Sequence, residues 1–322
     1  MRANGGNARR GGFALLAVLW VIAVMAILGA TLAAVGRTSV QGARNRIAIR
    51  RARWKAEGCG EELLAQIGGD LQRASQMGGD ATSRSWNGVA DRLATQRETI
   101  PRDDIVCTAR ATAAGATLDV NNADGDLLQH VLAHLGYAHS DSLTDVLLDW
   151  RDADDDPRER GAEREWYAAH GRSPPRNGPI ADVRELSDIR GFDRLDAVTL
   201  IPLDSVLGVE PGRIALNQAP PLLLSALPGF TAEAVQRVMV HRARGEPVTD
   251  VVTLAGELSP EARAPLQAAL GDLSRLTTTE PDAWILTIRA RAGTPAVTVV
   301  VELRIARAGT RPAVVRRRNW LE

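Results

Sequence analysis

The stretch RRGGFALLAVLWVIAV, residues 9–24, decides how the rest of this 322-residue chain is arranged. It opens a run of about 23 uncharged residues from Phe13 to Val35. A helix of that length crosses a hydrocarbon core of about 30 Å. A secretory signal peptide has a shorter apolar core, of roughly 7 to 15 residues, so a conventional cleaved signal is disfavoured. The sequence predicts a membrane helix near its N-terminus.

Charge is unevenly distributed along a chain that is neutral overall. Residues 1–55 hold ten basic residues and no acid, whereas Asp119–Glu165 hold thirteen acids and four arginines. Basic residues on both sides of the apolar run leave its orientation undecided by the positive-inside rule. Because the acids lie in the middle of the folded part, binding to a polyanion is a poor interpretation.

The basic stretch that ends at Gly12, directly before Phe13, resembles the class III leaders of type IV pilins and type II secretion pseudopilins. A membrane peptidase cuts such leaders after the glycine and methylates the new N-terminus. The resemblance therefore implies a leader of residues 1–12 and an N-methylated Phe13. Most of these subunits carry a glutamate five residues into the mature chain, where this sequence has Ala17. A plain N-terminal anchor is the alternative.

Periodicity organises the chain after the membrane helix, which we assign to residues 13–36. Residues 37–78 contain no proline, and apolar residues recur at helical spacing up to Gly78 and Gly79, which predicts a stem helix. Residues 104–120 predict a hairpin that follows a linker around Trp86, and residues 282–321 predict three more strands. We expect 79–120 and 277–322 to form one sheet, with the helical residues 121–276 inserted between the strands.

The inserted residues contain an internal repeat. LDVNNADGDLLQHVL (118–132) and IALNQAPPLLLSALPGF (214–230) both place an asparagine and an alanine between a strand-like segment and a leucine-rich helix. The asparagine is expected to cap that helix: Asn121 or Asn122 in the first copy, and Asn217 in the second.

The leader, the two repeats, LLDWRDADDDPRERGAEREWY and RELSDIRGF together resemble the K-type minor pseudopilin family of type II secretion systems, over essentially the whole chain. The resemblance implies an α+β pseudopilin fold, in which a long N-terminal transmembrane and stem helix packs on a small antiparallel sheet with a large all-helical insert. This family typically lacks the early glutamate, which agrees with Ala17.

The same resemblance implies a role and a location. Such a subunit caps the pseudopilus tip and helps to initiate assembly with the other minor pseudopilins, of the I and J types. It is processed by the prepilin peptidase and works with the inner-membrane secretion platform. The expected location is the inner membrane of a Gram-negative bacterium, with a single membrane pass and the bulk of the chain in the periplasm.

Five aspartates lie within residues 149–156, and Glu163 follows. Positions one, three, five and twelve of an EF-hand ligand pattern are occupied by Asp152, Asp154, Asp156 and Glu163, residue types that surround Ca²⁺ with hard oxygens. Position six is Pro157 instead of glycine, so a helix-loop-helix EF-hand is not expected. The family resemblance independently implies calcium here, with Asp149 among the ligands. A solvated charged loop is the alternative.

The sequence offers two other interpretations besides secretion. LSALPGFTAEAVQRVMVHR looks like a helix-hairpin-helix, which favours a DNA-binding minor pilin of a type IV pilus or competence system as the alternative. Thr231 replaces the second glycine of that turn, and the chain has a single lysine, so nucleic acid is not expected as a partner. Catalysis is not expected either. His130 and His134 lack a zinc-protease glutamate, and Ser225 lies outside a nucleophile elbow.

The chain has two cysteines, Cys59 and Cys107. Two thiols exclude a disulfide scaffold and a cysteine-based zinc site. They allow one bridge in an oxidising compartment such as the periplasm.

Overall fold

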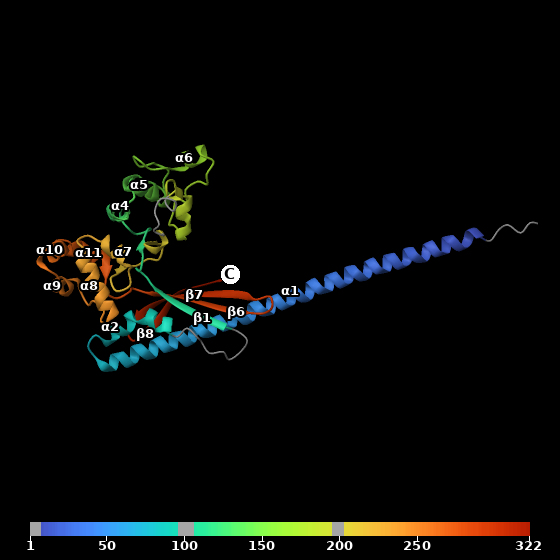
Figure 1. The fold of residues 1–322 in the computed structure, drawn as a ribbon, viewed down its shortest axis with the longest axis horizontal. Coiled ribbons are helices and arrows are strands. Elements are labelled where there is room, and N and C mark those ends of the chain that lie inside the picture. The colour runs from blue at the N-terminus through green and yellow to red at the C-terminus, as the bar shows by residue number, and fades with distance from the viewer. Residues whose placement is uncertain (1–7, 96–105, 195–202) are drawn as a thin grey trace, which may run out of the picture.

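The computed structural model describes residues 8–95, 106–194 and 203–322. One very long helix, α1 (Ala8–Met77), carries a small sheet along its distal part, with a helical body beyond the sheet (Figure 1). Its 70 residues span about 105 Å at 1.5 Å per residue. Within the described ranges, α1 is the one helix long and apolar enough to cross a membrane. The predicted α+β arrangement of a long helix, an antiparallel sheet and a helical insert is confirmed.

Four strands form the main sheet: β1 (Val106–Ala113), β6 (Trp284–Ala292), β7 (Val297–Ala308) and β8 (Arg311–Leu321). They lie in the order β1-β6-β7-β8, and every neighbouring pair is antiparallel. β1 pairs with β6 across the whole insert, with Val106 opposite Arg291. The sheet therefore joins segments from both sides of the inserted residues.

Short helices make up most of the remaining structure. Two follow α1, and the others belong to the insert. Two parallel strand pairs, β2 with β3 and β4 with β5, join the insert to the residues directly before and after it. Their bounds are α2 (Ala81–Asn87), α3 (Val89–Thr95), β2 (Leu118–Asp119), α4 (Gly125–His134), α5 (Ser140–Arg151), α6 (Arg164–Ala169), η1 (Val183–Asp188), η2 (Phe192–Arg194), η3 (Leu203–Ser205), β3 (Leu207–Gly208), β4 (Ile214–Ala215), α7 (Pro221–Ser225), α8 (Ala232–Ala243), α9 (Val251–Gly256), α10 (Pro260–Ala268), α11 (Leu270–Leu276) and β5 (Thr277–Thr278).

The stem part of α1 packs on the sheet through one face. Leu63, Ile67 and Leu71, spaced four residues apart, are buried against apolar side chains of β6 and β7. A side chain at Gly60 would come within 3.2 Å of methyl groups of Ile288 and Leu303, so this glycine lets the helix approach the sheet closely. The stem and sheet share one core, and the insert has a separate one.

The predicted hairpin in residues 104–120 is wrong. β1 pairs with β6, while the residues after it form β2, which pairs with β3 inside the insert. The chain turns away at Gly115, whose carbonyl accepts a hydrogen bond of 2.9 Å from Ala215 N. A side chain at Gly115 would overlap the Arg213 carbonyl. The sequence shows the turn at Gly115, but the segment that packs against it, at Arg213 and Ala215, lies about a hundred residues further along the chain.

The predicted linker around Trp86 is also wrong in its described part. Residues 81–87 and 89–95 are helical, and Trp86 is buried in the stem and sheet core. Its indole donates a hydrogen bond of 2.8 Å to Pro281 O, and Trp284 returns one of 3.0 Å to Trp86 O. Pro101, placed in the same linker, lies outside the described residues.

Candidate metal centre in the inserted domain

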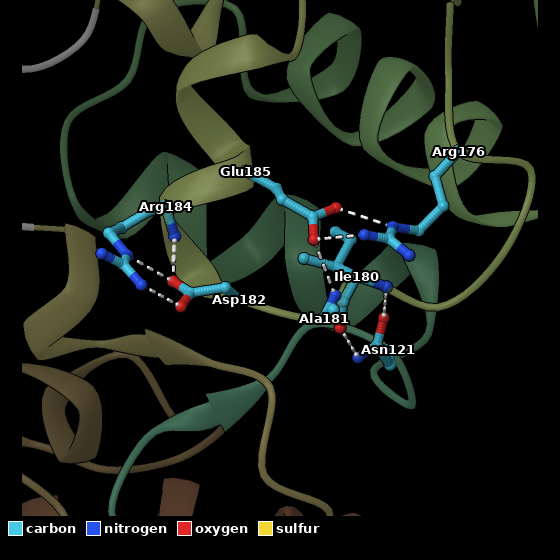
Figure 2. A network of polar contacts seen from close by, with 7 residues as sticks. All are labelled: Asn121, Arg176, Ile180, Ala181, Asp182, Arg184 and Glu185. Atoms are coloured by element: carbon cyan, nitrogen blue, oxygen red, sulfur yellow. Dashed lines mark hydrogen bonds and ion pairs between the residues drawn. The ribbon is translucent and has the colours of Figure 1, made fainter. Parts of the chain in front are cut away.

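The inserted domain, residues 121–276, is organised around two asparagines that act as clamps. Asn121 donates a hydrogen bond of 2.9 Å to Ile180 O and accepts one of 2.8 Å from Ile180 N (Figure 2). Asn217 makes the same pair of bonds with Val248, each 2.9 Å long. Each side-chain amide therefore pairs with both the backbone N–H and the backbone C=O of a distant residue, as a neighbouring strand would.

These contacts correct the predicted helix caps. Asp124 caps α4 by accepting a 2.8 Å hydrogen bond from Leu127 N, and α7 begins after Pro220 without a side-chain cap. An asparagine before a leucine-rich helix is a common capping pattern. Here Asn121 and Asn217 bind residues far along the chain instead, which the local sequence does not reveal.

The two halves of the inserted domain match in further details. Arg151 on α5 donates to the carbonyl of Val120, and Arg242 on α8 donates to that of Leu216, the residue before the clamp asparagine in each case. An aspartate caps the helix that follows the clamped residue, Asp182 for η1 and Asp250 for α9. The inserted domain is therefore built from two copies of one unit.

The copies differ in one connection. Twenty-eight residues separate Arg151 from Ile180, whereas five separate Arg242 from Val248. The extra chain, residues 152–179, contains one short helix, α6, and most of the acidic run. We call these residues the acidic loop. At its end, Arg176 forms a bidentate ion pair with Glu185, whose carboxylate also accepts from Ala181 N (Figure 2).

Three carboxylates meet where the acidic loop leaves α5, and one of them, Glu163, comes from the middle of the loop. One oxygen each from Asp149, Asp152 and Glu163 lies within 4.8 Å of the others. Asp149 is fully buried on α5 and Glu163 is 3% exposed. Neither oxygen of Glu163 has a hydrogen-bond partner, and Oδ1 of Asp152 also has none. Buried carboxylate oxygens without a donor are rare, because burial removes the water that would solvate their charge.

Electrostatics explain why this cluster is unusual. Burial, together with the negative charges of Asp149 and Asp152, raises the pKa of Glu163 to about 7. Burial also raises the pKa of Asp149, and hydrogen bonds from Arg158 oppose that rise. Nη1 of Arg158 lies 2.5 Å from an oxygen of Asp149 and 2.5 Å from one of Asp152. One arginine thus serves two carboxylates, and Glu163 faces the cluster without a cation.

The structure brings together Asp149, Asp152 and Glu163 among the five predicted ligands. Asp154 and Asp156 are exposed and lie outside the three-carboxylate cluster, and Oδ1 of Asp154 accepts a 3.1 Å bond from Asp156 N. The acidic segment has Pro157 at the sixth position of the EF-hand pattern. Its alternate aspartates, Asp152, Asp154 and Asp156, do not converge on one point as their spacing suggests.

Two residues of the site were missed in the sequence. A side chain at Gly161 would overlap the carboxylate of Asp149, so glycine is needed where the loop passes behind the cluster. Asn177 has a φ of 50° and donates 2.9 Å hydrogen bonds to Asp154 O and to the carboxylate of Asp155. Its Oδ1 is buried without a donor. Of these two residues, only Asn177 could have been suspected from the sequence, because asparagine is enriched at positive φ in tight turns.

The glycine turn that suggested DNA binding is packed against protein. Gly229 has a φ of 74°, and a side chain there would overlap Pro265 O on α10. Thr231 caps α8 by accepting a hydrogen bond from Ala234 N. The turn therefore has a structural role between α7, α8 and α10.

The two cysteines, the leader boundary and the rejected catalytic candidates lie apart from the acidic cluster. Cys59 on α1 and Cys107 on β1 are joined by a disulfide. His134 and Ser225 contact each other at 3.0 Å on the surface between α4 and α7. Gly12 and Phe13 fall in the first turns of α1, and residues 1–7 of the predicted leader lie outside the described residues.

Comparisons with known proteins agree with one another. The family model described as "Type II secretion system (T2SS), protein K" matches residues 108–209. The type II secretion system protein K of Klebsiella pneumoniae is 30% identical over 246 residues, covering 70% of this chain and 72% of that protein. The protein of the same name from Pectobacterium carotovorum subsp. carotovorum is 26% identical over 291 residues, covering 82% and 85%.

A solved structure has a similar fold. A chain in the crystal structure of the GspK-GspI-GspJ complex from the enterotoxigenic Escherichia coli type 2 secretion system matches with a TM-score of 0.60. The match covers 85% of this chain and 99% of that chain, at 14% identity. At this identity the likeness establishes the fold.

Proposed function

The chain belongs to the type II secretion system protein K family, and from that premise we propose that this minor pseudopilin caps the tip of a pseudopilus and helps to initiate its assembly. The family membership is the observation that carries the proposal. The pilus or DNA-uptake alternative receives no support from these relatives. The family is one of structural secretion components, which gives no reason to assign catalysis.

The position at the tip rests on two features. Ala17 stands where most pseudopilins carry a glutamate that pairs with the N-terminus of a neighbour, so docking under a preceding subunit loses its charged contact. The inserted domain adds about 156 residues to the end of the molecule that is remote from the apolar part of α1 (Figure 1). A subunit of this shape suits the last position of a filament better than a repeated one.

The partners follow from the same family. The similar solved structure is a complex of GspK with GspI and GspJ, so the I- and J-type minor pseudopilins are the proposed neighbours here. Prepilin peptidase would remove residues 1–12 and methylate Phe13. The apolar part of α1 would then remain in the inner membrane, with the rest of the chain in the periplasm and in contact with the secretion platform.

We also propose a structural calcium ion in the acidic loop. Its three convergent side chains, Asp149, Asp152 and Glu163, offer only carboxylate oxygens, the hard ligands that Ca²⁺ takes in flexible arrangements. The buried oxygens of Glu163 supply a second, independent argument, because they lack any donor in a site where charge is otherwise paired. A divalent ion would neutralise the cluster and tie the start and the middle of the loop to α5.

The central experiment is co-purification from membranes. The full chain should bring down the I- and J-type minor pseudopilins of its own system, and deletion of its gene should abolish secretion of that system's substrates. Complementation by the intact gene should restore secretion. A deletion strain that secretes normally would overturn the assignment.

A further inference from the structure

Three large apolar side chains on α1 are exposed at a spacing of seven residues. Val40 is 53% exposed, Ile47 is 54% exposed and Trp54 is 81% exposed. Ala52, two residues before Trp54, is fully buried against the sheet. Two residues correspond to a rotation of about 200° at 3.6 residues per turn. The three side chains therefore line the side of the stem opposite the sheet.

Their spacing is that of one heptad position. With Val40, Ile47 and Trp54 at position a, position d falls on Gly36, Ala43 and Arg50, which is mostly small. The small residues at position d let a second helix approach closely between the large apolar side chains at position a. Gly36 has open space where a side chain would begin. The pattern is that of a helix that packs along another helix.

The flanks of this face are basic. Position e holds Arg37, Arg44 and Arg51, and position g holds Arg46 and Arg53. All five arginines are exposed. The first acid of the chain is Glu57, which pairs with Arg53 at 3.2 Å. In coiled coils, charges at e and g select the partner, so this face selects acidic flanks.

We propose that this face, the stem seam (Val40, Ile47 and Trp54 with the arginines at e and g), docks the stem helix of another minor pseudopilin whose apolar stripe is flanked by glutamates or aspartates. The inference rests on the proposed function, and it specifies the chemistry of the partner. A second copy of this chain is disfavoured, because its seam would set arginines against arginines.

A membrane surface does not suit the seam as its occupant. Trp54 lies 18 residues beyond Gly36, about 27 Å along the helix from the end of the apolar run. Attraction to anionic headgroups is screened over about 8 to 10 Å at ordinary salt. Headgroups could attract Arg37, but they leave Ile47 and Trp54 in water.

The first test uses the full chain in nanodiscs of phosphatidylcholine and two synthetic 21-residue helices. Both helices carry isoleucine and leucine at positions a and d; one has glutamate at e and g, and the other has lysine. The glutamate helix should bind at least tenfold more tightly. Ile47→Ser with Trp54→Ser should weaken that binding at least tenfold, while Val252→Ser, which removes a 65% exposed valine on α9, should leave it unchanged.

Charge reversal gives the sharper test. Arg44→Glu with Arg51→Glu should reverse the preference, so that the lysine helix becomes the better ligand. Equal binding of both helices by the wild type, or no reversal in the variant, would overturn the proposal. So would nanodiscs with phosphatidylglycerol that protect the seam arginines from trypsin while the glutamate helix fails to bind.

Co-purification separates this inference from the proposed function. The seam variants should lose the I- or J-type subunit that the wild type retains. If wild type and variants retain both subunits equally, the seam proposal fails and the proposed function stands. If the wild type retains neither, the proposed function itself fails.

Discussion

Replacing Glu163 by glutamine should stabilise the protein when calcium is absent. The side chain is 3% exposed, its oxygens have no hydrogen-bond donor, and its pKa rises from 4.5 to about 7. At 1.36 kcal/mol per pH unit, holding this carboxylate ionised destabilises the folded state by about 3 kcal/mol at pH 8. Glutamine has the same shape without the charge, and its amide can donate to the unpartnered oxygen of Asp152.

The pH window follows from the sign of this shift. Below pH 4.5 the carboxyl is neutral in both the folded and unfolded states, so the penalty is absent. As pH rises from 4.5 to about 7, the unfolded chain releases the proton before the folded chain does, and the free energy of unfolding falls. Without calcium, the advantage of Glu163→Gln should therefore grow across this window and level off above it.

The assay is thermal unfolding of the full chain in detergent at pH 8, with chelator or with millimolar calcium. One kcal/mol shifts the melting temperature of a domain of this size by about 2 to 4 °C. In chelator, Glu163→Gln should melt several degrees above the wild type. Calcium should stabilise the wild type against unfolding by about 2.7 kcal/mol at a hundredfold excess over Kd, and so raise its melting temperature. The melting temperature of the variant should hardly change.

Glu165→Gln is the matched control, because Glu165 is exposed and lies outside the cluster. It should melt like the wild type in chelator and keep the full response to calcium. A Glu163→Gln variant that melts below the wild type in chelator would refute the burial argument. An equal calcium response in wild type and Glu163→Gln would refute the placement of the ion.

Three further outcomes are expected. Gly161→Ala should destabilise the acidic loop by about 1 to 3 kcal/mol and weaken calcium binding in isothermal titration calorimetry, because the new methyl group overlaps a buried carboxylate. The control Gly256→Ala, whose methyl group meets open space, should change calcium binding little. Intact-mass analysis of the membrane form should show cleavage between Gly12 and Phe13 with one added methyl group; a mature chain that begins near residue 35 would contradict this. Ala17→Glu should leave the fold intact and raise the number of copies per crosslinked pseudopilus, since a membrane glutamate is costly unless it pairs with a neighbour; unchanged stoichiometry would count against the glutamate argument.

The sequence was most informative where contacts are local. Helical spacing in α1 predicts the buried face of Leu63, Ile67 and Leu71, because side chains three and four residues apart share a helix face. Strand alternation predicts β6, β7 and β8, because they are consecutive and joined by short turns. Such signals require only neighbours in the chain.

The sequence was least informative where partners are remote. The hairpin prediction failed because β1 pairs with β6, and the capping prediction failed because Asn121 and Asn217 bind residues 59 and 31 positions away. In the candidate metal site, spacing suggested Asp152, Asp154, Asp156 and Glu163, and the family resemblance added Asp149. Of these five, Asp149, Asp152 and Glu163 converge in the structure. Convergence at that site depends on how α5 and the acidic loop pack, which one-dimensional spacing does not encode.

Because β1 pairs with β6, the sheet that covers the stem part of α1 can form only after the C-terminal strands have been synthesised. Three of the four strands come from residues 284–321, so the apolar face of α1 around Leu63 stays uncovered until that segment has been synthesised. The inserted domain has its own core and can fold earlier. The inserted domain can therefore be folded before the apolar face of the stem is covered. A chain interrupted before residue 284 would leave this apolar helix face exposed, which favours aggregation and proteolysis.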